Sequence, residues 1–166
     1  MEIRPEEQRD IDAIHSVTVE AFKNVAISNQ TEQFIITALR RDNALSISLV
    51  ASIENEIAGH IAFSPIAISD GSVDWYTLGP VSVRPTFQKQ GIGSALIKKG
   101  LSELKEMNAQ GCVLVGNPNY YRRFGFKNDS RLLFEGVPAE VFLILPFGDT
   151  VPRGNIELHK GFWATE

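Results

Sequence analysis

The segment Gln88–Ser94, which contains Gly91 and Gly93, stands between an apolar strand and a long amphipathic helix. Glycines at a helix start let the backbone approach a ligand closely. The unpaired N–H groups of the first helical turn and the positive end of the helix dipole then form an anion site. The segment is not a dinucleotide fingerprint, because Leu96 stands where a third Gly or Ala is needed, and it lacks the Gly-Lys-Ser/Thr of a P-loop. The spacing therefore predicts phosphate binding of another kind.

The charge distribution also indicates a local anionic ligand. The net charge of the chain is −4, which argues against non-specific nucleic-acid binding. Residues 75–126 nevertheless carry +5, the remainder carries −9, and no Asp or Glu occurs from Trp75 to Ser102. A basic middle third in an acidic chain is typical of an anion site. The alternative is a chance cluster of solvated lysines.

Length and composition predict one globular domain over residues 1–166, with 43% apolar and 22% charged residues. The single cysteine, Cys112, excludes an internal disulfide or multi-cysteine zinc site, and its apolar surroundings indicate a small buried hydrophobe. No cluster of His, Cys and Asp has the spacing of metal ligands, so we expect no metal. No apolar run approaches the roughly 18 residues of a membrane span. We therefore expect no membrane partner and a cytoplasmic location.

The elements that must position the glycine segment follow from hydrophobic periodicity. Helical spacing predicts helices over 11–22, from Thr31 onward, and from Gly91 to about Asn108. Strand patterns cover Leu45–Ile53, Ile57–Ile68, Trp75–Val83, Cys112–Val115 and Val141–Leu145. Because Cys112–Val115 is continuously apolar and follows a helix, it is typical of a buried parallel strand. This order predicts a three-layer α/β (α+β) domain around a mixed central sheet.

The dipeptide Gly79-Pro80 interrupts the strand Trp75–Val83 near its middle. Proline lacks an N–H group and glycine weakens strand pairing, so we expect this strand to be bulged or splayed. A splayed strand leaves main-chain donors and acceptors free for a ligand lying alongside it.

Two motifs in this region resemble those of the GNAT superfamily of N-acetyltransferases. Gln88-x-x-Gly91-x-Gly93, preceded by a strand ending Val-x-Val-x-Pro, resembles the acetyl-coenzyme A (acetyl-CoA) signature of that superfamily. Tyr121-Arg-Arg-Phe-Gly-Phe126 resembles its Tyr-x-x-x-Gly-Phe motif, and the wider run 116–126 is similar to the YhbS-like branch. The resemblance implies a GNAT-like acyl-CoA N-acyltransferase fold, acetyl-CoA as co-substrate and a small-molecule or peptide amine as acceptor. It leaves a homodimer open.

The resemblance also implies roles for individual residues. The backbone of Val81, Ser82 and Val83 would pair with the pantetheine arm, and Tyr121 would stand near the thioester sulfur as general acid. Main-chain N–H groups would hold the pyrophosphate, supplied by Gln88, Lys89, Gln90, Gly91, Ile92, Gly93 and Ser94.

Two positions depart from the family pattern. Many members carry an Asn seven residues before the tyrosine, where this chain has Leu114, and Asn117 is the nearby candidate for that cofactor contact. Many members also carry a Glu on the splayed strand or its neighbour, and Trp75–Val83 contains none.

An amine acceptor needs a base. An alkylamine with a pKa near 10.4 is only about 0.04% neutral at pH 7, a handicap of about 4.6 kcal/mol. The candidates are His60, Asp74 and Ser82, or a chain of water molecules, and His60 is the most favoured single side chain. His60 lies in an alternating strand, which also fits a packed structural histidine. Tyr120 and Tyr121 would diverge by about 100° in a helix, so we expect only one to face the sulfur.

Two other interpretations stay open from the sequence. One is a non-catalytic acyl-CoA-binding or sensor domain, which the missing strand carboxylate and the missing Asn favour. The other is a protein-interaction domain that uses the fold only as a scaffold, and it predicts no acetyl-CoA binding.

Overall fold

A six-stranded mixed sheet forms the centre of the computed structural model, which describes residues 1–166. Neighbouring strands run antiparallel except β5 and β6, which are parallel. In spatial order the strands are β1 (Glu2–Pro5), β2 (Ile47–Ile53), β3 (Glu56–Pro65), β5 (Trp75–Val83), β6 (Gly111–Val115) and β8 (Phe142–Pro146). The parallel strands β5 and β6 belong to one strand–helix–strand crossover, as expected for a buried apolar strand that follows a helix.

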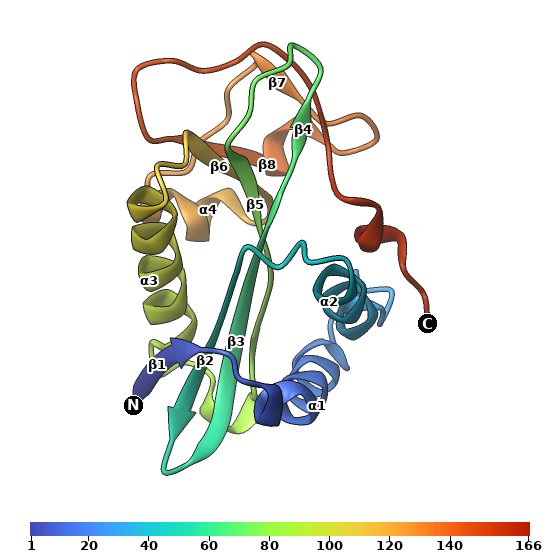
Figure 1. Cartoon of the computed structure of the whole chain (residues 1–166), viewed down its shortest axis with the longest axis vertical. Coiled ribbons are helices and arrows are strands. Elements are labelled where there is room, and N and C mark those ends of the chain that lie inside the picture. Colours follow the sequence, from blue (N-terminus) through green and yellow to red (C-terminus); the bar gives the residue numbers. More distant parts are fainter.

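Helices cover both faces of this sheet (Figure 1). Helices α1 (Ile11–Phe22) and α2 (Glu32–Arg41) lie on one face, and α3 (Ile92–Glu106) and the short α4 (Pro118–Tyr121) lie on the other. Each long helix turns an apolar stripe to the sheet, as its spacing predicts. The buried residues of these stripes include Ile14 and Val17 in α1, Ile36 and Leu39 in α2, and Leu96, Ile97, Leu101 and Leu104 in α3. The predicted three-layer α/β fold around a mixed sheet is confirmed.

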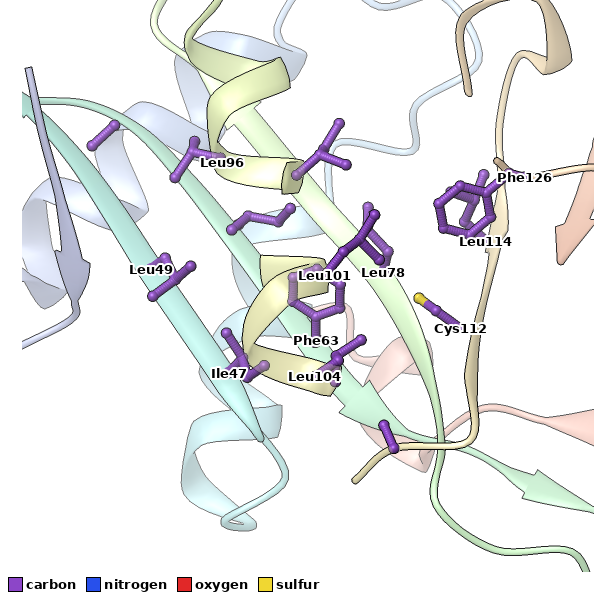
Figure 2. Packing of buried hydrophobic residues seen from close by; sticks show 14 of the residues in the cluster. Ile47, Leu49, Phe63, Leu78, Leu96, Leu101, Leu104, Cys112, Leu114 and Phe126 are labelled. Carbon is purple, nitrogen blue, oxygen red and sulfur yellow. The ribbon is translucent and has the colours of Figure 1, made fainter. Parts of the chain in front are cut away.

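The largest apolar core lies between α3 and the sheet (Figure 2). It contains 17 buried residues, including Phe63 of β3 and Cys112 of β6. A Cβ atom at Gly100 would overlap the Phe63 ring, so glycine is what allows the ring to pack directly under α3. Burial of a Phe side chain stabilises the fold by about 1.5–3 kcal/mol. This contact therefore helps to fix α3, and the loop before it, against the sheet. Burial raises the pKa of the Cys112 thiol, consistent with the predicted structural role.

A second sheet of three short strands lies at one end of the molecule. Its order is β4 (Ala67–Ile68), β9 (Gly154–Glu157) and β7 (Leu132–Leu133). The prediction of one strand over Ile57–Ile68 is therefore wrong, because β3 ends at Pro65 and β4 pairs with β9 instead. Proline lacks an N–H group and so interrupts the ladder. No sequence pattern predicts this sheet, because its strands are too short to show the alternation of apolar and polar side chains that identifies a strand.

The chain start also differs from expectation. No predicted element precedes the helix over 11–22, but Glu2–Pro5 forms edge strand β1 against β2. A 3₁₀ turn over Gln8–Asp10 then leads into α1. The buried Asp10 carboxylate accepts hydrogen bonds from the Glu7 N–H (2.7 Å) and the Arg4 guanidinium (2.6 and 3.0 Å). Tertiary pairing thus overrides the local preference of this segment.

Candidate functional site

The two parallel strands at the centre of the sheet separate after three residues. Pairing joins Trp75–Thr77 of β5 to Gly111–Val113 of β6, and all of β6 pairs with β8 on its other side. On its other side β5 pairs with β3 up to Val83, with a register shift between Ile61 and Phe63. From Leu78 onward, β5 therefore has no strand partner on the side of β6. This confirms the splay predicted from Gly79-Pro80, and it leaves backbone groups that an extended ligand can pair with.

The loop between β5 and α3 presents a run of free backbone donors. Gly91 precedes α3 with φ of 84°, a conformation that favours glycine. The Gln88 side chain donates to the Val83 carbonyl (3.0 Å) and closes the loop. None of the backbone N–H groups from Lys89 to Ser94 donates to another backbone group of the chain. Several donors at the positive end of a 15-residue helix can bind a phosphate or pyrophosphate.

A groove of about 290 Å³ adjoins this loop, and we call it the loop groove. Its lining residues are Ala21, Phe22, Val25, Val81, Val83, Gln88, Gly93, Ile97, Tyr120 and Tyr121. Five of the predicted site residues therefore meet here, although they come from three separate segments. A Cβ atom at Gly93 would lie 3.7 Å from Val83 Cγ2 and 3.9 Å from the Tyr120 hydroxyl, so the fold itself tolerates a side chain at this position.

Both consecutive tyrosines line the loop groove. Their ring centroids are 5.0 Å apart and their planes are nearly perpendicular (89°). Tyr121 packs against Phe126 (6.1 Å) and is largely buried, and burial raises its pKa to about 12. Tyr120 stacks under the Arg123 guanidinium, whose central carbon lies 4.4 Å from its ring centroid. A tyrosine with a raised pKa keeps its proton at neutral pH, so Tyr121 can donate one.

A second space, the strand-gap cavity, lies where β5 and β6 separate and has a volume of about 240 Å³. Its lining residues are Phe22, Glu32 and Ile35, Thr77 to Pro80, Val113 to Val115, and Phe134, Phe142, Ile156, Leu158 and Phe162. Phe22, the last residue of α1, lines both the loop groove and this cavity. The two spaces therefore share a wall at the end of α1, beside the unpaired part of β5.

Glu32 is the one charged residue that lines the strand-gap cavity. Its Oε1 accepts a hydrogen bond from the Ser28 hydroxyl, whereas its Oε2 is buried and has no hydrogen-bond partner. Glu32 is not among the site residues predicted from the sequence. No local signal could have done so, because a Glu at a helix start has the ordinary appearance of a capping residue.

Comparison with known proteins decides the family. The profile of the acetyltransferase (GNAT) family matches residues 11–126, which include the splayed strand, the loop and both tyrosines. The chain belongs to the GNAT family of acetyltransferases. Both motifs that suggested this family lie within the matched range.

Individual GNAT relatives cover nearly the whole chain. The uncharacterized N-acetyltransferase YhbS of Escherichia coli K12 is 31% identical in an alignment of 152 residues that covers 87% of this chain and 90% of YhbS. The crystal structure of a GNAT family acetyltransferase from Brucella melitensis in complex with acetyl-CoA is 45% identical, covers 97% of both chains and has a TM-score of 0.87. The E. coli YhbS structure in complex with CoA is 26% identical, covers 99% of this chain and 93% of that one, and has a TM-score of 0.89. The predicted resemblance to the YhbS-like branch is confirmed.

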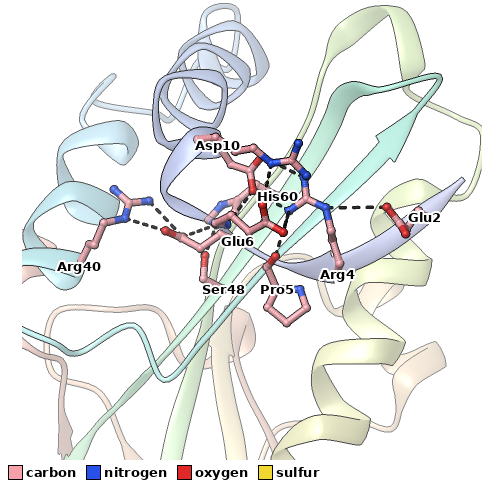
Figure 3. A network of polar contacts seen from close by, with 10 residues as sticks. Glu2, Arg4, Pro5, Glu6, Asp10, Arg40, Ser48 and His60 are labelled. Atoms are coloured by element: carbon pink, nitrogen blue, oxygen red, sulfur yellow. Dashed lines mark hydrogen bonds and ion pairs between the residues drawn. The ribbon is translucent and has the colours of Figure 1, made fainter.

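His60 lies outside both the loop groove and the strand-gap cavity. Its side chain has no exposed surface and sits between the sheet and helices α1 and α2. Its Nε2 lies 2.7 Å from Ser48 Oγ and 3.8 Å from the Glu6 carboxylate (Figure 3). Burial lowers the pKa of His60, so the ring is neutral at pH 7. The ring lines neither the loop groove nor the strand-gap cavity, so the structure places His60 apart from the other predicted site residues.

His60 belongs instead to a partly buried polar network with Glu6, Arg40 and Ser48 (Figure 3). Arg40 of α2 donates to Glu6 at 2.8 and 3.1 Å, and the Ser48 hydroxyl of β2 also donates to Glu6. Although burial raises the pKa of Glu6, the nearby His60 ring and hydrogen bonds from Arg40 and Ser48 lower it to about 2. The network joins the segment after β1 to α2, β2 and β3.

The remaining predicted residues have varied positions. Ser82 is buried opposite His60, so only its backbone can serve a ligand along β5. The Ile92 side chain is part of the core, which likewise leaves its backbone N–H for the site. Asn117 begins α4, where its side chain accepts from the Asn119 N–H (2.9 Å), and it does not line the loop groove. Asp74 is an exposed turn residue before β5, outside both spaces.

Other site classes find no counterpart in the structure. No group of three or more His, Cys, Asp or Glu side chains comes together in a way that could hold a metal ion. No helix has the length and apolar character needed to cross a membrane.

Proposed function

We propose that this acetyltransferase transfers the acetyl group of acetyl-CoA to a primary amine by direct attack in a ternary complex. The run of free N–H groups from Lys89 to Ser94, beside a strand edge without a partner, is the observation that carries the proposal. It supplies donors for a pyrophosphate and, next to them, backbone for an extended arm. The Brucella relative in complex with acetyl-CoA supports the same ligand here.

In this proposal the pyrophosphate lies on the loop from Gln88 to Gly93 and on Ser94. The pantetheine arm runs along the backbone of Val81, Ser82 and Val83, within the loop groove. The thioester then lies at the splay, with the acceptor entering from the strand-gap cavity. Asn117 is the least supported of the proposed contacts, because its side chain already caps α4.

The transfer needs one proton removed from the ammonium and one supplied to sulfur. The neutral amine attacks the thioester carbonyl, a C–N bond forms and the C–S bond breaks. Tyr121 donates its hydroxyl proton to the leaving thiolate, and the proton that the nitrogen loses on becoming an amide restores the tyrosine. The leaving thiol has a pKa of about 8.5, so this assistance to the leaving group is modest.

Two measurements test the proposal. Mass spectrometry of the purified native protein should detect co-purified CoA, and thiol release from acetyl-CoA with a panel of primary amines should exceed the hydrolysis blank. A non-catalytic acyl-CoA-binding domain would bind CoA and show no amine-dependent thiol release. A scaffold domain would show neither.

The proposal extends to the setting of the enzyme. We assign residues 1–166 to one N-acetyltransferase domain that acts in the cytoplasm on a small-molecule or peptide amine. The homodimer stays a prediction, which sedimentation of the native protein tests.

A further inference from the structure

We infer that Glu32 binds the ammonium group of the acceptor and takes its proton, and that the acceptor is a small primary amine with an apolar body. This inference rests on the proposed acetyl transfer and names its base and substrate class. The residue is on α2, outside the strands where a base was sought.

The state of the carboxylate is the first argument. Buried polar atoms in proteins nearly always have a hydrogen-bond partner, so an orphan needs an explanation. In Glu32, the Ser28 hydroxyl holds Oε1, and the buried Oε2 contacts no donor. A carboxylate fixed at one oxygen and free at the other is suited to bind a cation that the chain itself does not supply.

The location of the carboxylate is the second argument. Glu32 shares the strand-gap cavity with Leu78 to Pro80 of β5 and with Leu114 and Val115 of β6. These are the residues at which the two strands separate. An amine held in this cavity would approach the thioester at the splay, whereas Tyr121 would act from the loop groove. Base and acid would then act from two different spaces, which share Phe22 as a lining residue.

The cavity walls define the rest of the acceptor. Of the 15 lining residues, 11 are hydrophobic, and the Thr77 hydroxyl is already used by the Val113 carbonyl. A hydroxyl-rich amine such as an aminosugar would leave its hydroxyls without partners here. The volume of about 240 Å³ is below the roughly 300–1,000 Å³ of pockets for drug-sized ligands. A phenylethyl or short alkyl group fits these limits.

The proton steps balance with this assignment. Glu32 Oε2 takes one proton from R–NH₃⁺ and leaves R–NH₂, which attacks the thioester carbonyl as described above. After the amide leaves, the Glu32 carboxylic acid releases its proton to water. The net reaction converts ammonium and acetyl-CoA to amide, free CoA thiol and one proton.

The test compares wild-type protein with Glu32→Gln, which keeps the shape of the side chain and removes its charge. Glu106→Gln, at the exposed end of α3, is the matched control. Calorimetry measures acetyl-CoA affinity and the affinity of the CoA-saturated protein for 2-phenylethylamine and glucosamine. Thiol release gives kcat/KM for both amines from pH 7 to pH 10.

We expect wild-type protein and Glu106→Gln to bind phenylethylamine and to prefer it to glucosamine. The Glu32→Gln substitution should lower the affinity for phenylethylamine at least tenfold and kcat/KM at pH 7 about 100-fold. The affinity for acetyl-CoA should stay unchanged. Because neutral amine becomes available in solution near its pKa of about 10, the deficit of the variant should shrink as the pH rises. A merely structural role of Glu32 would give a deficit that does not depend on pH.

Four further outcomes would overturn the inference. If the amine affinity and kcat/KM of Glu32→Gln stay within twofold of wild type, the assignment of the base is wrong. If the CoA-saturated wild type does not bind phenylethylamine, or binds glucosamine equally well, the substrate class is wrong. In each of these cases acetyl-CoA binding still stands. If the wild-type protein binds no acetyl-CoA, the proposed function fails, and this inference fails with it.

Discussion

In the partly buried network of Glu6, Arg40, Ser48 and His60, polar side chains bind one another, whereas the backbone N–H groups from Lys89 to Ser94 donate to no other backbone group. Only Nδ1 of His60 lacks a partner in that network. Both regions concentrate hydrogen-bonding groups, and both border β5 or its neighbour β3.

The difference lies in what completes each region. Apart from Nδ1 of His60, the network is completed within the chain, so its groups stabilise the fold and hold α2 against the sheet. The loop donors and the Oε2 of Glu32 are completed only by another molecule, so they mark the places where ligands bind. A reactive residue type therefore indicates a functional site only when its hydrogen-bond partners in the folded chain are known.

The largest expected effect lies in the loop. Gly93→Glu should weaken acetyl-CoA binding by about 100-fold or more, because a carboxylate would fill the groove and repel the pyrophosphate. Calorimetry measures the affinity, and circular dichroism checks the fold. Gly93→Ala is the control, since a Cβ atom fits at this position, and it should change the affinity only slightly. An unchanged affinity in folded Gly93→Glu would remove the loop from the site.

Acid should weaken the network. The folded pKa of Glu6 is about 2, below the value of about 4.3 for an unfolded chain. The unfolded state therefore binds the proton first, and the stabilisation present above pH 4.3 is lost as the pH falls towards 2. Allowing for solvent screening of the partly exposed carboxylate, the loss is about 2 kcal/mol. Urea unfolding of wild type and Glu6→Gln should show their difference in free energy of unfolding shrinking over this range. A constant difference would contradict the ion pair.

Tyr121→Phe should lower kcat by about 10–100-fold, at the low end for a general acid, because the thiolate is already a fair leaving group. Acetyl-CoA affinity and stability should hardly change, since the packed ring remains. Steady-state thiol release measures the effect, with Tyr120→Phe as the matched variant. Greater damage in Tyr120→Phe would assign the acid role to that neighbour. Near-normal turnover in both variants would leave Tyr121 as a packing residue.

The smallest effect is expected for His60→Gln. The loss of the buried contact to Ser48 should reduce the free energy of unfolding by about 1 kcal/mol. The pH dependence of kcat/KM should stay the same, because the ring reaches neither the loop groove nor the strand-gap cavity. Parallel urea unfolding and pH–rate profiles check both parts. If an ionisation in the pH dependence of kcat/KM disappears in the variant, His60 takes part in the reaction.

Local pattern was sufficient for much of the fold. The span of β5, the helix after Gly91 and the parallel strand ending at Val115 follow from periodicity and from glycine and proline chemistry, which act within a few residues. The splay followed in the same way, because Gly79-Pro80 weakens pairing wherever it occurs in a strand. The loop and both family motifs lie in this same continuous stretch.

The sequence by itself thus determined the family, the crossover and the backbone anion site, since each depends on neighbours along the chain. Only the tertiary structure decided that His60 is buried in a polar network, that Glu2–Pro5 forms an edge strand, that β4 separates from β3, and that Glu32 lines the strand-gap cavity. Glu32 meets the splayed strand across more than forty residues of sequence, and Arg40 meets Glu6 across 34. Packing of helices on a sheet sets such contacts, and no short-range pattern encodes which polar side chain it will leave without a partner.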